Sequence, residues 1–191
     1  MEDFSNQDDY RYEYEEDKPS FTVGQAILKY GLYLGLAIIG FNLLIFLTKM
    51  YLSEISSLIY ALYITAMVFA VIEFKKKNEG FMSFGQGVGI GTGVATLGAG
   101  VIGALFYFVY INAIQPEIGQ HIQEYAIEQS RKVLESFNYT EEQIEKSQEA
   151  SQKFNNPMLQ WFVNLLGVAL LGVIFALIIS AFTKKKRPLF E

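Results

Sequence analysis

The sequence predicts an all-α integral membrane protein with four transmembrane helices and an extracytoplasmic helical hairpin between the third and fourth spans. Hydrophobic residues make up 51% of the 191 residues, yet the charged residues gather in a few blocks, as in a chain that crosses a bilayer several times. One uncharged stretch, residues 85–108, contains eight glycines. Each glycine would cost a soluble helix roughly 0.5–1 kcal/mol relative to alanine, whereas a bilayer offers the backbone no partner outside a helix.

The first 22 residues form an acidic segment that we expect to be a disordered tail, because it has too few apolar residues to build a core. Secretory signal peptides begin with basic residues, so this acidic start predicts that no signal peptide is cleaved. Residues 10–15 alternate tyrosine with charged residues, so the alternatives to a solvated tail are a strand added to a partner's sheet and a docking motif.

The first span is predicted at residues 26–47. Gly31 and Gly35 form a small-xxx-small pair, which allows another helix to approach closely. Lys29 lies within a turn of the start of the span, so its ammonium group can reach the membrane interface.

The second span is predicted at residues 55–74, long enough to cross a hydrocarbon core of about 30 Å. Glu73 is four residues before Lys77, a spacing that favours a local ion pair on the helix surface. A carboxylate that relays protons is the alternative, although the edge of a span is an unfavourable place for one.

The third span is predicted at residues 85–111, with Ser83 as its N-cap and Gln86 completing a capping box. A small residue recurs at every fourth position and a row of glycines lies beside it, which predicts a flat face for helix packing. The alternatives are a pore or ligand cavity along this face, or a re-entrant helix at residues 85–93. The two rows are Gly87, Gly91, Ala95, Ala99 and Gly103, and Gly85, Gly89 and Gly93.

Residues 112–156 form the predicted extracytoplasmic hairpin. Pro116 suits the first turn of one helix, and Thr140 begins a capping box that opens a second, more polar helix. Asn156 is an N-cap followed by proline, so the fourth span is predicted at residues 157–183.

Two amides inside the spans, Asn42 and Asn164, are expected at similar depth. We hypothesise that they form a hydrogen bond across the bundle, worth on the order of 0.6–2 kcal/mol. The alternative is that each amide binds a local backbone carbonyl or interfacial water.

Two basic clusters set the predicted orientation. Four spans place both clusters on one side, which the positive-inside rule assigns to the cytoplasm, together with both termini and the basic tail at 184–191. The clusters are Lys75, Lys76 and Lys77, and Lys184, Lys185, Lys186 and Arg187.

The function classes are limited by the residues that the chain lacks. It has no cysteine and one histidine, so we expect no catalytic residue, no cofactor and no metal. His121 with Glu117, Glu124 and Glu128 could ligate a metal by spacing, but a solvated acidic face is the preferred interpretation. Residues 98–103 match the GxGxxG nucleotide fingerprint, yet they lie inside a span rather than after a soluble strand.

Short motifs at the ends of the spans resemble those of a bacterial family of small four-span membrane proteins, the domain of unknown function family 4199. The resemblance covers about residues 23–186 and implies a multi-pass protein of the bacterial cytoplasmic (inner) membrane, without implying an activity or a catalytic residue. The motifs are Lys29-Tyr30-Gly31, Glu73-Phe74-Lys75, Asn78-Glu79-Gly80, Ser83-Phe84-Gly85-Gln86, Pro116-Glu117 and the terminal lysine run.

The expected function is that of a non-enzymatic interaction or accessory subunit in the membrane. The expected partners are the lipid bilayer and a protein that binds the hairpin or the acidic tail. No nucleic acid is expected. The glycine face is compatible with an oligomer. The alternative is a small-solute transporter or channel component that uses the glycine-rich third span, and an intramembrane enzyme comes third.

Overall fold

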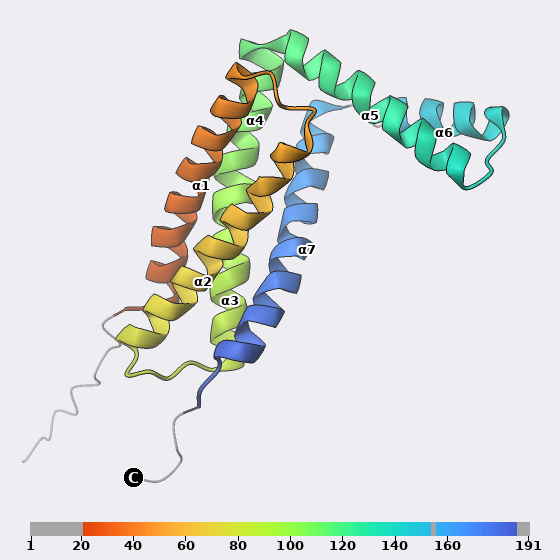
Figure 1. Cartoon of the computed structure of the whole chain (residues 1–191). Helices are drawn as coiled ribbons and strands as arrows, with labels where there is room; N and C mark the ends of the chain where they lie inside the picture. Colours follow the sequence, from red (N-terminus) through yellow and green to blue (C-terminus); the bar gives the residue numbers. More distant parts are fainter. Residues whose placement is uncertain (1–20, 154–155, 187–191) are drawn as a thin grey trace, which may run out of the picture.

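The computed structural model describes residues 21–153 and 156–186, and this part of the chain is helical apart from short connections (Figure 1). Four of its helices are long and apolar enough to cross a membrane, so the predicted all-α, four-span fold class is confirmed. They make the chain a multi-pass membrane protein. The predicted acidic tail lies outside the described residues except for its last two, and so does Arg187.

The spans follow the predicted order. The first is α1 (Val23–Leu47), and the second is the 3₁₀ helix η1 (Glu54–Leu58) followed by α2 (Ile59–Lys77). The third span joins α3 (Phe84–Ala95), η2 (Thr96–Gly103), α4 (Ala104–Val109) and η3 (Tyr110–Ile114). The fourth is α7 (Pro157–Thr183).

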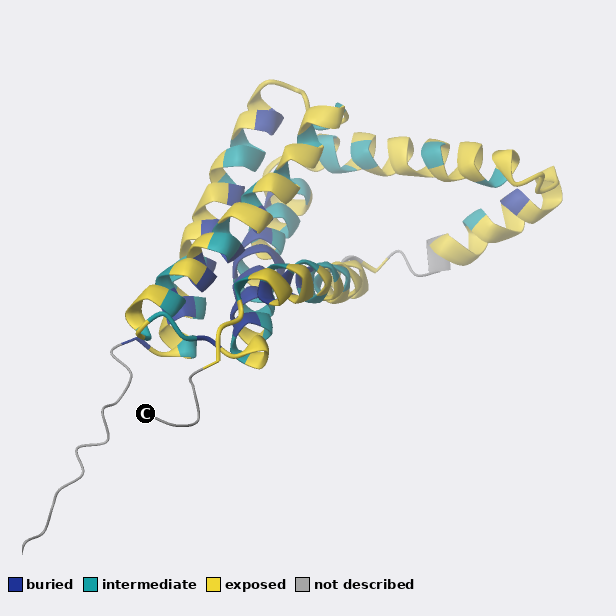
Figure 2. Cartoon of the chain, turned by 60° about the horizontal axis from the view of Figure 1, so that its bottom comes forward, coloured by how far each residue is buried: buried dark blue, intermediate teal, exposed yellow. Residues whose placement is uncertain are grey.

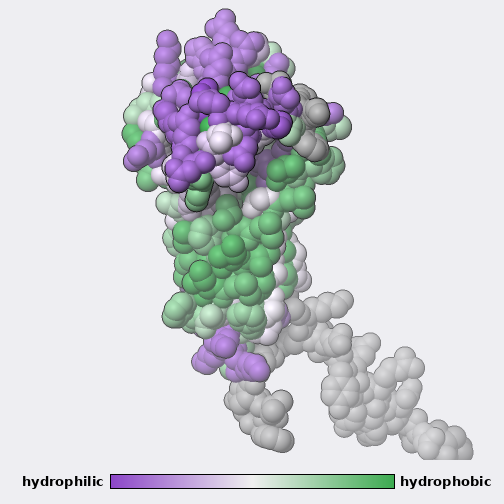
Figure 3. Space-filling model, turned by 90° about the vertical axis from the view of Figure 1, so that its right-hand side faces the viewer, coloured by the Kyte–Doolittle hydropathy of each residue, from purple (hydrophilic) through white to green (hydrophobic). Residues whose placement is uncertain are grey.

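Neighbouring spans run in opposite directions, so the bundle has two distinct ends (Figure 1). The basic end holds Lys75, Lys76, Lys77 and the lysines after α7, and the arm end holds the connection from α1 to α2. On the face shown in Figure 3, a hydrophobic belt separates hydrophilic groups at the two ends. This distribution is the one that a bilayer requires of a spanning protein.

The helix starts follow local capping chemistry. The Ser83 hydroxyl accepts a hydrogen bond from the backbone N–H of Gln86, and the Gln86 side-chain oxygen accepts one from the backbone N–H of Ser83. The predicted capping box is therefore confirmed. Thr22 and Gln25 form a second such box, which begins α1 three residues before the predicted start. The Asn156 side chain accepts from the first amides of α7, as expected for an N-cap before proline.

The third span lies at the centre of the bundle, between α1 and α7. A methyl group added at Gly31 or Gly35 of α1 would lie 2.7 Å from Leu97 or Ile102. On the other side, a methyl group at Gly91 would lie 2.7 Å from the Ala176 side chain of α7. Glycine on both partners therefore allows backbones to pack at distances that a side chain would forbid. Figure 2 shows buried residues on the inward sides of these helices.

The two predicted glycine rows do not pack equally. In the second row, Gly93 lies against Ile27, whereas no atom lies within 4 Å of the Cβ position at Gly85 or Gly89. In the described part of the chain, Gly85 and Gly89 therefore have no close contact with another helix at the Cβ position, unlike Gly93. In the first row, Gly87, Gly91, Ala95, Ala99 and Gly103 are all buried.

The third span contains a change of helix type that the sequence did not predict. Its middle, Thr96–Gly103, is a π-helix, in which each backbone bond spans one residue more than in an α-helix. The helix does not break at residues 85–93, as the re-entrant alternative would require, since α3 is continuous there.

An ion cluster closes the basic end. Glu73 and Lys77 form the predicted ion pair at 3.0 Å, and the Lys29 ammonium group joins the same carboxylate from α1. Close by, Lys75 Nζ donates to the Thr183 carbonyl at 2.8 Å, so α2 is also tied to the end of α7.

The predicted hairpin consists of α5 (Pro116–Ser136) and α6 (Glu141–Lys153), together called the arm. Asn138 makes the turn with a positive φ of 61°, and Arg131 of α5 binds Glu141 of α6 at 2.7 Å. Ile144 of α6 is buried, with 1% of its surface exposed. The arm leaves the arm end of the bundle and projects sideways past α7 (Figure 1).

Candidate functional site

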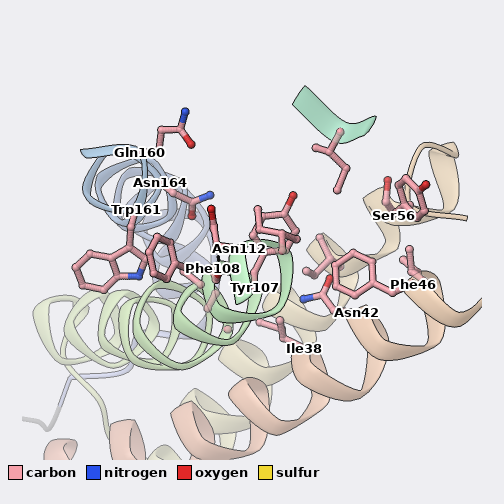
Figure 4. A pocket seen from close by; sticks show the side chains of 18 of the residues that line it. Ile38, Asn42, Phe46, Ser56, Tyr107, Phe108, Asn112, Gln160, Trp161 and Asn164 are labelled. Carbon is pink, nitrogen blue, oxygen red and sulfur yellow. Dashed lines mark hydrogen bonds between the residues drawn. The ribbon is translucent and has the colours of Figure 1, made fainter. Parts of the chain in front are cut away.

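A cavity of about 370 Å³ lies at the arm end of the bundle. Its walls come from all four spans, and Ile122 of α5 also lines it. Figure 4 shows Asn42 of α1 and Asn164 of α7 on different sides, with Tyr107 and Asn112 of the third span between them. The lining side chains with polar atoms are Asn42, Tyr51, Ser56, Tyr63, Tyr107, Asn112, Gln160, Trp161 and Asn164.

The cavity extends to the middle of the membrane-spanning part. Its deepest lining residue on the third span, Ala99, is midway along the 31 residues from Phe84 to Ile114. Ala99 and Gly103 belong to the π-helical segment, so the unpredicted change of helix type forms the floor of the cavity. Toward the basic end, Gly91 and the residues around it pack directly against α7 and close the bundle.

The structure brings the two predicted amides, Asn42 and Asn164, to one cavity. Among the described residues no hydrogen bond joins them, so their direct bond stays a prediction. Asn112 donates instead to the Phe108 carbonyl of its own helix at 2.8 Å. The amides of Asn42 and Asn164 thus supply donors and acceptors on opposite walls of a shared space.

An indole group adds a further unused donor. The Nε1 atom of Trp161 is buried and finds no hydrogen-bond partner in the described part of the chain. A buried donor without a partner costs about 1–3 kcal/mol, and a ligand acceptor in the cavity would remove that cost. Trp161 is also the single tryptophan of the sequence.

Aromatic contacts make one wall of the cavity rigid. The rings of Phe46 and Tyr110 stack with centroids 4.6 Å apart, and Tyr107 lies 6.0 Å from Phe46. Near this wall, the Tyr51 hydroxyl is 3.3 Å from His121 Nδ1 of α5. The first turns of α5 are therefore held against the arm end of the bundle.

Among the described residues, the lining carries no carboxylate, ammonium, guanidinium or imidazole group. A charged ligand would lose its water here without gaining an ion pair, which is strongly unfavourable in a low-dielectric site. An uncharged ligand can use the amides, hydroxyls and rings. His121, Glu117, Glu124 and Glu128 lie along α5, and the described residues include no group of three or more side chains arranged to hold a metal.

The family described as protein of unknown function, DUF4199, matches residues 29–185 of this sequence. The chain belongs to DUF4199. The matched region includes every residue that lines the cavity, so the site lies within the part of the chain that matches DUF4199. No curated protein and no solved structure matches the chain.

The sequence alone predicted part of this cavity. It singled out Asn42, Asn164 and the small residues Ala99 and Gly103, but it did not include Asn112 or Trp161 among the site residues. The signal that could have found them is position, because polar and aromatic residues gather in the arm-end half of each span. A pattern of that kind predicts a wet pocket once the spans are aligned by depth.

Proposed function

We propose that the protein is a non-enzymatic binding and interaction subunit of the membrane, and that it takes a small uncharged molecule into the cavity at the arm end. The observation that carries the proposal is a polar and aromatic lining without charge, which reaches the middle of the spans. Amide and hydroxyl groups with aromatic rings suit a compact ligand that has several hydroxyl groups and an apolar face.

Transport of a small solute is the second candidate, and the depth of the cavity favours it. A transporter needs a second state that opens toward the basic end. That opening would have to separate Gly91 from Ala176 and Gly87 from Ser180, where the backbones pack through glycine. The tight packing supports binding from one side as the leading proposal.

The location we propose is the bacterial cytoplasmic membrane, with both termini in the cytoplasm. The support is the lysines at the basic end, since cytoplasmic ends of spans carry an excess of basic residues. The arm and the mouth of the cavity would then face the extracytoplasmic side. A protein partner would meet either the polar face of the arm or the acidic residues 1–22.

The experiment uses Trp161 as the reporter, because it lines the cavity and is the single tryptophan. The full chain in lipid nanodiscs is titrated with glucose, methyl glucoside and inositol, and with glucose 6-phosphate and glucuronate as charged counterparts. We expect a saturable change in Trp161 emission with at least one uncharged probe and none with the charged ones.

Ala104→Leu is the blocking variant, since Ala104 lines the cavity and a larger side chain would fill it. Ala113→Leu is the matched control, because Ala113 is exposed further along the same span. Loss of the response in Ala104→Leu alone supports the proposal. A flat titration with every uncharged probe, or an equal response to charged probes, contradicts it.

A further inference from the structure

The helix α5 has an apolar face and a charged face. Its exposed and half-buried apolar residues are three, four or eight positions apart, so they share one side of the helix. The four glutamates are seven, four and seven positions apart and fall on another side. The apolar residues are Ile118, Ile122, Tyr125, Val133 and Phe137, the last directly after the helix, and the glutamates are Glu117, Glu124, Glu128 and Glu135.

The first turns of α5 fix the direction of the apolar face. Ile122 lines the cavity, and a methyl group at Gly119 would lie 2.6 Å from the Ile111 carbonyl oxygen at the end of the third span. The apolar side of α5 therefore points toward the bundle where the helix begins. Because the residues further along share this side, they point the same way after α5 has passed the edge of the bundle.

The far half of α5 extends beyond the bundle. At 1.5 Å per residue its 21 residues are about 31 Å long, and the arm projects past α7 at the level where the spans end (Figure 1). Val133 is 53% exposed and Phe137 is 71% exposed. These exposures show that the partner helix α6 leaves both side chains open.

We propose that the apolar face of α5 rests on the surface of the bilayer beside the bundle, with the glutamate face turned toward water. Lipid is the occupant because the same face is continuous with the contact between α5 and the ends of the membrane spans. A protein whose spans are surrounded by lipid necessarily has lipid headgroups next to α7, below the projecting arm. The arrangement is that of an amphipathic helix lying in the interface.

Apolar contact, rather than charge, holds this face. The arm carries eight glutamates and four basic residues, so anionic lipid would repel it on balance. The contact is therefore expected in a bilayer of uncharged phosphatidylcholine. This proposal is independent of the ligand proposed for the cavity.

The test is a spin-label accessibility measurement on the full chain in phosphatidylcholine nanodiscs. The chain has no cysteine, so Val133→Cys and Phe137→Cys each give a single labelling site. Glu124→Cys on the charged face is the matched control, and all three positions are exposed, so the substitutions leave the packing intact. Oxygen, which partitions into lipid, is compared with a water-soluble nickel complex as the relaxing agent.

We expect oxygen to relax the labels at 133 and 137 more than the nickel complex does, and the order to be reversed at 124. Equal access of the nickel complex to all three labels would overturn the proposal, because the face would then be in water. Protection of 133 and 137 from both agents would also overturn it, because a protein and not lipid would then cover the face.

Discussion

Lys29 and Glu73 join the first two spans at the basic end of the bundle, although they are 44 positions apart in the sequence. The Lys29 ammonium group donates to both carboxylate oxygens, at 2.9 and 2.7 Å, and Lys77 binds the same carboxylate. The Glu73 side chain is 19% exposed, so the pair is partly shielded from water. A carboxylate that binds two ammonium groups fixes where α1 and α2 meet.

We expect Glu73→Gln to lower the free energy of unfolding by about 1 kcal/mol, because Lys29 and Lys77 lose their shared acceptor. The measurement is thermal unfolding of the purified chain in detergent. Glu128→Gln, which removes an exposed pair with Lys132 on the arm, is the control and should leave the midpoint unchanged. Equal effects of the two substitutions would contradict a special role for the Glu73 cluster.

Two glycines in α3, only two residues apart, should respond oppositely to alanine. A methyl group at Gly91 would lie 2.7 Å from the Ala176 side chain, so Gly91→Ala should destabilise the bundle by about 1–3 kcal/mol. Gly89 faces open space, and Gly89→Ala should be neutral or stabilising by up to about 1 kcal/mol. Thermal unfolding of both variants in the same detergent decides this, and equal destabilisation would refute the packing geometry.

Asn164→Leu should separate binding from stability. Its amide lines the cavity, and no hydrogen bond joins it to Asn42 in the described part of the chain, so we expect its replacement to cost the bundle little stability. We expect the unfolding midpoint to be unchanged or raised, while the Trp161 emission response to uncharged probes weakens. A variant that unfolds early would indicate that Asn164 holds the bundle together, as the predicted bond to Asn42 requires.

Glu128 on the charged face of α5 should keep its negative charge to a lower pH than an unpaired glutamate. The hydrogen bond from Lys132 lowers the pKa of Glu128 below its ordinary value of 4.5. A lowered pKa means that the ion pair is fully formed above 4.5 and is lost as the pH falls through the folded-state pKa, and this exposed pair is too weak to move the unfolding midpoint. The Glu128 carboxyl ¹³C shift should therefore titrate below 4.5, and Lys132→Gln should move the midpoint back up. An unchanged midpoint in Lys132→Gln would contradict the assigned cause.

The elements that the sequence predicts well are those set by neighbouring residues. The capping box at Ser83 and Gln86, the turn before Thr140 and the N-cap at Asn156 each depend on a few adjacent side chains, and each lies where expected. Span length is likewise a local property, because hydrophobicity is summed over one segment. These features need no knowledge of what packs against them.

The features that the sequence did not predict depend on contacts between distant segments. The ion pair between Lys29 and Glu73 forms only if these two residues lie at the same depth along α1 and α2. The periodicity of residues within one helix does not indicate its depth relative to another helix. The two glycine rows of the third span have the same spacing, so the sequence could not tell which glycines pack against another helix. That depends on the neighbours of each glycine in the folded bundle. The sequence pattern also gave no sign of the π-helix at Thr96–Gly103.

The packing of α3 against α7 also has a consequence for how the chain is made. Gly87 and Gly91 lie against Ser180 and Ala176, which belong to the fourth span and follow the arm in the sequence. The ribosome must complete the whole arm before these partners emerge, so the glycine face of α3 waits in the membrane uncovered. A nascent chain that stops before α7 would present this face to its surroundings. The fourth span therefore completes the bundle, because its insertion covers the small-residue face of α3.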